Sequence, residues 1–144
     1  MRTELVKGIT IRPLRNGDTA AVQAVFDQLG SRSRHLRFGG AKNVLTANDL
    51  EQLARVDCDH HVLVALAKGE PVALARLVRE GDVAEVAIEV ADEWQGGRVG
   101  TLLMSRLAAD ARAAGIRQLH AVVDLENTAS RALMRRAEVR VSAA

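Results

Sequence analysis

The chain has 144 residues, of which 48% are hydrophobic, 26% are charged and only 2% are aromatic. This length predicts a single domain over residues 1–144, with a core built from aliphatic side chains. The net charge of +2 and the scarcity of aromatic residues argue against a nucleic-acid-binding module. Cys58 is the only cysteine, which excludes an internal disulfide and a cysteine-based metal cluster.

The start of the chain and its hydropathy argue against export and membrane insertion. Residues 1–8 lack the apolar core of a signal peptide, and no apolar run approaches the roughly 18 residues of a membrane span. His60 and His61 are adjacent in a predicted strand and so point to opposite faces, and no third ligand follows at a recognisable spacing. We therefore expect a cytoplasmic protein with no metal and no membrane partner.

The first part of the chain predicts one strand followed by three helices. Residues 9–14 alternate as a strand does, and Asp18 is placed to cap a helix over 19–29. The basic segment 31–38 predicts a short helix, and apolar residues at helical spacing predict another at 47–56.

The middle of the chain changes to the two-residue period of strands. Strands are predicted at 61–67, 72–79 and 83–90, joined by tight turns that contain glycine. Such spacing predicts an antiparallel meander.

The last third returns to helical spacing. A stripe of apolar residues predicts a helix from Val99 that Gly115 ends, followed by a strand at 119–125, a helix at 128–137 and at most a short strand at 138–141. The order is therefore β-α-α-β-β-β-α-β-α-β, which indicates an α/β fold with a mixed sheet and helices on both faces.

The segment 95–101 is a glycine-rich turn between a strand and a helix. The first amides of a helix have no partners within the helix and carry partial positive charge. Gly96, Gly97 and Gly100 allow the backbone to approach an anion closely, and the side chains of Gln95 and Arg98 add donors. From these residues alone, phosphate binding and a plain tight turn are equally supported.

This turn and the strand before it, Ile-Glu-Val-Ala-Asp-Glu-Trp-Gln at 88–95, resemble motif A of the GNAT superfamily of N-acetyltransferases. Asn127-Thr-Ala-Ser130 resembles the Asn-x-x-Ser/Ala that opens the fourth helix of that family, and the element order is also similar. The chain looks most like the acetyltransferase domain of bacterial Pat-type protein-lysine acetyltransferases, which share the Ile-Arg-Pro-Leu-Arg start found here at 11–15.

The resemblance implies an acyl-CoA-dependent N-acetyltransferase. Its cosubstrate is expected to be acetyl-CoA, with the pantetheine arm between two splayed strands, and its acceptor a primary amine, expected to be a protein lysine. The residues expected to hold acetyl-CoA are Ile88, Glu89, Val90, Gln95, Gly96, Gly97, Arg98, Val99, Gly100, Thr101, Asn127 and Ser130.

The resemblance also implies the catalytic groups. An alkylammonium is not nucleophilic, so a base is needed. Glu85 is the expected base, and Glu89, with the same side-chain parity on the strand, is the alternative. The Tyr that many family members use as the acid corresponds to Met134, and the chain contains no Tyr. Water, Ser130, Cys58 or unassisted departure of the thiolate remains for that step.

Two departures from the family pattern favour a second hypothesis, a catalytically degenerate acyl-CoA-binding sensor or regulatory domain. Arg98 stands where the family usually has Gly, with Gly97 one place early, and Glu138-Val139 replaces the usual Gly-Phe after the fourth helix. The last strand is expected to be short or contributed by a partner chain, which leaves a homodimer open.

Overall fold

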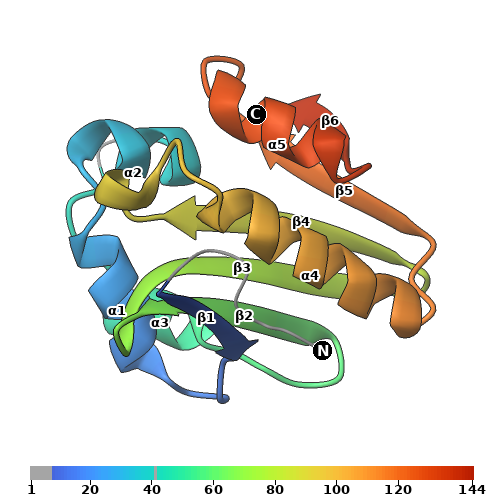
Figure 1. Cartoon of the computed structure of the whole chain (residues 1–144), viewed down its shortest axis with the longest axis horizontal. Helices are drawn as coiled ribbons and strands as arrows, with labels where there is room; N and C mark the ends of the chain where they lie inside the picture. The colour runs from blue at the N-terminus through green and yellow to red at the C-terminus, as the bar shows by residue number, and fades with distance from the viewer. Residues whose placement is uncertain (1–7, 41) are drawn as a thin grey trace.

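The computed structural model describes residues 8–40 and 42–144 and has the predicted order of elements (Figure 1). Residues 1–7, which carry most of the sequence-based argument against a signal peptide, lie outside the described residues. The elements are β1 (Ile9–Pro13), α1 (Thr19–Asp27), α2 (Ser31–Phe38), α3 (Ala47–Leu53), β2 (His60–Ala67), β3 (Glu70–Glu80), β4 (Val83–Val90), the 3₁₀ turn η1 (Asp92–Trp94), α4 (Val99–Ala113), β5 (Gln118–Val123), α5 (Thr128–Arg136) and β6 (Arg140–Ala143).

The strands form one mixed sheet in sequence order, β1-β2-β3-β4-β5-β6. Neighbours from β1 to β4 are antiparallel, whereas β4 with β5 and β5 with β6 are parallel. β4 and β5 pair only from Val83 and Gln118 as far as Glu85 and His120. Beyond that pair the two strands diverge, so the sheet opens into a fork whose apex lies at Glu85 and His120 (Figure 1).

Helices cover the two faces of the sheet unequally. α4 lies along one face (Figure 1), where Leu103, Met104 and Leu107 are fully buried. α1 packs on the other face, where Val25 and Phe26 belong to a second core cluster. This second face becomes exposed toward β5, because Val122 is 48% exposed.

The end of the chain corrects one expectation. The last strand lies at Arg140–Ala143, later than the predicted 138–141, and it pairs with β5 of the same chain. The delay has a physical cause: α5 ends in a Schellman turn, in which the amide of Glu138 donates to Arg135 O and the amide of Val139 donates to Met134 O. Because the strand comes from the same chain, it gives no reason to expect a dimer.

Candidate functional site

A cleft of about 380 Å³ lies beside the fork, bounded by the end of β4, the start of α4, α5 and α2. Ten of the twelve residues expected to hold acetyl-CoA line this cleft: Ile88, Glu89, Val90, Gln95, Gly96, Gly97, Gly100, Thr101, Asn127 and Ser130. The other two do not line it, since Arg98 is exposed and Val99 is buried in the core.

The glycines of the turn have different structural roles. Gly96 has φ +78°, a conformation that side chains disfavour. Gly100 lies against α5, because a Cβ at this position would be 3.1 Å from Leu133 Cδ2. Arg98 is the N-cap of α4 with φ −107° and ψ 1°, which any L-residue can adopt. Arg98 therefore does not distort the turn.

Gln95 ties the turn to its surroundings. Its Nε2 donates to Val90 O at 2.9 Å, to Ser33 Oγ at 3.2 Å and to Asp92 Oδ1 at 3.3 Å. The amide nitrogen of Gln95 therefore already has partners within the protein.

One wall of the cleft is α2, and Asp92 holds its N-terminus. The Asp92 carboxylate accepts from Gly30 N at 3.0 Å and from Ser33 Oγ at 2.6 Å. Gly30 is needed for this contact, because a Cβ there would lie 2.6 Å from Asp92 Oδ2. Sequence reasoning missed Ser33 and Asp92 because 59 residues separate them and no local pattern marks such a contact.

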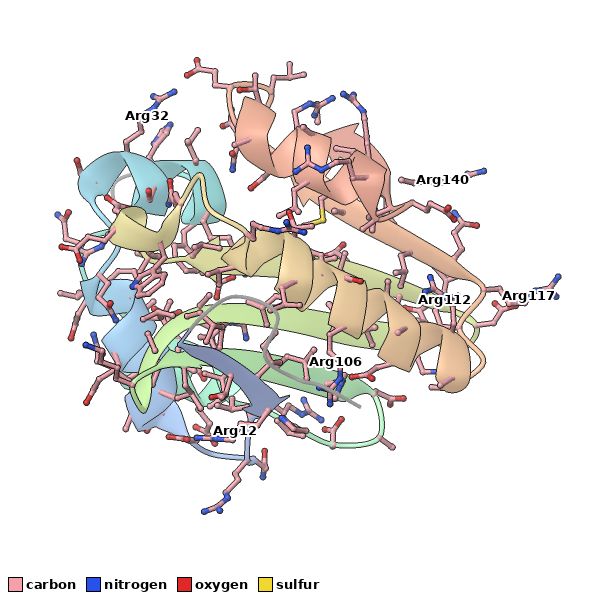
Figure 2. The ribbon with its side chains drawn as sticks, viewed as in Figure 1. Arg12, Arg32, Arg106, Arg112, Arg117 and Arg140 are labelled. Atoms are coloured by element: carbon pink, nitrogen blue, oxygen red, sulfur yellow. The ribbon has the colours of Figure 1, made fainter. Side chains whose placement is uncertain are left out.

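α2, which lines the cleft, and the loop before α5 approach each other. Figure 2 shows Arg32 projecting from α2, and its Nη2 is 3.8 Å from Glu126 Oε2 in that loop. Both side chains are largely exposed, so this ion pair contributes little to stability. It does show how closely α2 and the loop approach each other.

Glu89 is buried at the inner end of the cleft. One carboxylate oxygen accepts from Arg37 Nε and the other from Arg76 Nη2, both at 2.6 Å. Burial alone would raise the pKa of Glu89, but the charges of Arg37 and Arg76 and their hydrogen bonds outweigh it and lower this pKa to about 2. A carboxylate with such a low pKa and both oxygens engaged is a poor proton acceptor. The structure therefore argues against Glu89 as the base.

Glu85 has a different environment. It is exposed on β4 at the apex of the fork, on the same face of the sheet as Glu89 but about 13 Å further back along the strand. It does not line the cleft and makes no ion pair among residues 8–40 and 42–144. Val78, its partner on β3, is 42% exposed, and Val83 is 39% exposed. The Glu85 carboxylate thus stands on an open, partly apolar face.

α5 contributes the opposite wall of the cleft. Asn127 caps the helix by accepting from Ser130 N at 3.2 Å. Arg136 lines the cleft and has no ion-pair partner within the described part of the chain. Sequence reasoning did not identify Arg136, because nothing separates it from the other arginines of the helix. Met134 is only 1% exposed, so its position belongs to the core.

The described residues contain no group of three or more His, Cys, Asp or Glu side chains that would hold a metal ion. Among the helices in the same part of the chain, none has the length and apolar character needed to cross a membrane.

Comparison with known proteins identifies the family. The family model for the acetyltransferase (GNAT) family matches residues 28–138. The chain is 36% identical over 132 residues to acetyltransferase Pat of Mycolicibacterium smegmatis, covering 88% of this chain and 39% of that protein. It is 33% identical over 132 residues to acetyltransferase PA5475 of Pseudomonas aeruginosa, covering 87% of this chain and 71% of that protein.

Solved structures agree. The GNAT domain of S. lividans PAT superposes with a TM-score of 0.84 at 30% identity, covering 90% of this chain and 80% of that chain. The chain spans about two-fifths of the length of the mycobacterial Pat protein, so it corresponds to one part of that protein. The chain belongs to the GNAT acetyltransferase family, a family of acyl-CoA-dependent N-acetyltransferases.

Proposed function

We propose that this chain transfers an acetyl group from acetyl-CoA to the side-chain amine of a protein lysine, with Glu85 as the general base. The observation that carries the proposal is the position of Glu85: an exposed carboxylate at the apex of the fork, on the same strand and sheet face as Glu89 in the cleft that collects the expected acetyl-CoA residues.

The cleft suits the phosphates and the pantetheine arm of acetyl-CoA. The unpaired amides at the start of α4 and the open backbone at Gly96 and Gly97 favour the pyrophosphate, and Arg136 adds a positive charge. Beyond Glu85, the fork leaves the main chain of β4 without a partner strand on the β5 side, and its groups there are available to the pantetheine amides. In this arrangement the arm enters at the wide end of the fork and the thioester points toward the apex.

The reaction needs a group that removes a proton from the acceptor. A lysine ammonium has an ordinary pKa of about 10.4, so it must lose a proton before its nitrogen can attack the thioester carbonyl. Glu85 accepts this proton directly or through one water, whereas Glu89 is held by two arginines. A backbone amide within Ile88–Val90 polarises the carbonyl oxygen as negative charge develops on it.

The surroundings of Glu85 favour a protein acceptor over a small amine. Exposed Val78, Val83 and Val122 lie on the same open face of the sheet. A small amine is usually bound in an enclosed pocket, whereas an open apolar surface suits a folded partner that presents one lysine.

The test compares Glu85→Gln with Glu80→Gln, a matched change of an exposed carboxylate at the end of β3 on the same face. Acetyl transfer is followed by release of coenzyme A with a lysine-rich protein and with small amines, and acetyl-CoA affinity is measured by calorimetry. We expect Glu85→Gln to lose at least about 100-fold in kcat with unchanged affinity, and Glu80→Gln to match the wild type.

Two other outcomes have distinct meanings. Full turnover in Glu85→Gln across the pH range would show that Glu85 is not the base. A wild-type protein that binds acetyl-CoA tightly but transfers nothing to any amine would support the degenerate acyl-CoA sensor instead.

A further inference from the structure

His120 is the partner of Glu85 across the apex of the fork. It lies on β5 in register with Glu85, and its side chain is partly exposed on the same face of the sheet. Its Nε2 is 2.9 Å from Ser142 Oγ on β6. The charged and titratable groups that face it from neighbouring strands are Glu85 on β4 and Arg140 on β6. Three adjacent strands therefore present a polar row, Glu85–His120–Ser142.

The proposed reaction lacks a proton donor for the leaving sulfur. The chain contains no Tyr, and Met134, which corresponds to the Tyr of related enzymes, is 1% exposed in the core. Cys58 lies just before β2, which β3 separates from β4, so it is remote from the fork. The hydroxyl of Ser130 is a far weaker acid than an imidazolium, whose ordinary pKa is about 6.5. Among the described side chains, His120 is the acid in register with Glu85 at the apex, where it competes with water and with unassisted departure of the thiolate.

Resting on the proposed function, we infer that His120 is the general acid that protonates the departing coenzyme A thiolate. The lysine nitrogen bonds to the acetyl carbon, and the carbon–sulfur bond breaks with its electron pair going to sulfur. Glu85 takes the proton lost by nitrogen, and the imidazolium of His120 gives its proton to sulfur. Each group is reset by exchange with solvent, to which both are open.

Ser142 determines which ring nitrogen faces the substrate. In the imidazolium both ring nitrogens are donors, so Nε2 donates to Ser142 Oγ and the proton on Nδ1 is left for transfer, because Nδ1 has no partner within the described residues. Ser142 is thus a positioning residue: it fixes the orientation of the ring and does not touch the reacting atoms.

The first experiment needs no turnover. Coenzyme A is added to the full chain, and the imidazole resonances are followed by NMR, with His120→Gln used for assignment. We expect the His120 signals to shift on saturation while those of His60, which bonds to Asp57 at 2.7 Å at the start of β2, stay in place. His120 signals that do not move with saturating coenzyme A would overturn the inference.

The second experiment measures turnover and chemical rescue. We expect His120→Ala to lose about 100-fold in kcat with unchanged acetyl-CoA affinity, and added imidazole to restore part of the loss. Ser142→Ala is expected to lose several-fold. His60→Ala should match the wild type and not respond to imidazole.

The outcomes separate this inference from the proposed function. A His120→Ala protein that keeps its activity, or that is inactive and does not respond to imidazole, would remove the acid role while leaving Glu85 as the base. A wild-type protein inactive toward every amine would overturn the proposed function itself, and the acid role with it.

Discussion

Replacing Glu89 with Gln tests the contact between α2 and the end of β4. The Glu89 carboxylate is buried and paired with Arg37 and Arg76, and its pKa falls from an ordinary value of 4.5 to about 2. Each pKa unit corresponds to 1.36 kcal/mol, so the ionised carboxylate stabilises the fold by about 3 kcal/mol at neutral pH. Glutamine keeps the shape but leaves two guanidinium groups without their counter-charge, so we expect a loss of about 3 kcal/mol.

The sign of the pH dependence is fixed by the direction of the shift. Because the pKa of Glu89 is lower in the folded state, its contribution is fully present above about pH 4.5 and is lost as the pH falls through about 2. Urea unfolding of the wild type and of Glu89→Gln should therefore differ by about 3 kcal/mol at pH 7 and converge toward pH 2. Glu93→Gln, at an exposed carboxylate in η1, is the control. A difference below about 1 kcal/mol at pH 7, or one independent of pH, would refute this account of Glu89 and its two arginines.

Two other pairs of variants test the local geometry. Glu138 has φ +62° in the Schellman turn of α5, whereas Gly115 has φ +83° at the same position of the turn that ends α4. Glu138→Gly should therefore raise the free energy of unfolding by about 1 kcal/mol, and Gly115→Ala should lower it by about as much. If urea unfolding showed both variants changing this free energy in the same direction, the two positions would not share the left-handed conformation. Asp92→Ala removes the carboxylate that holds α2, and Gly30→Ala displaces it. Each variant should weaken acetyl-CoA binding several-fold in calorimetry, and the double variant should lose no more affinity than either single variant. Losses that add fully in the double variant would mean that the two residues act separately.

Most of the fold was predictable because the hydrophobic period changes sharply along the chain. The three central strands and the long helix α4 are each specified by their own residues, and the structure places them within a few residues of the predicted bounds. The ends of elements were less predictable, since turns decide them. Helix α3 ends at Leu53, short of the predicted residue 56, where the amide of Val56 donates to the side chain of Asn16, 40 residues away.

The candidate site was also predictable only in part. The turn at 95–101 and the Asn127 cap were predictable because neighbouring residues create them. The strand pattern alone could not distinguish Glu85 from Glu89 as the base, because the two residues are four apart on one strand and their side chains lie on the same face of the sheet. The two carboxylates differ in their environments, and that of Glu89 comes from Arg37 on α2 and Arg76 on β3. No local pattern shows that two arginines from distant elements meet at one of two similar carboxylates.

The structure weakens the support that the departures from the family pattern gave to a degenerate domain. Arg98 has an ordinary backbone conformation and lies outside the cleft, so the turn keeps its form without a glycine there. Glu138 takes the left-handed conformation that glycine favours, and Val139, 4% exposed, belongs to the main core. Replacing a glycine lowers local stability when the backbone there needs φ > 0. It impairs function only when the new side chain fills space that a ligand would occupy. Neither position meets that second condition, so these two departures no longer favour a degenerate domain, and that alternative depends on the chemistry at Glu85 and His120.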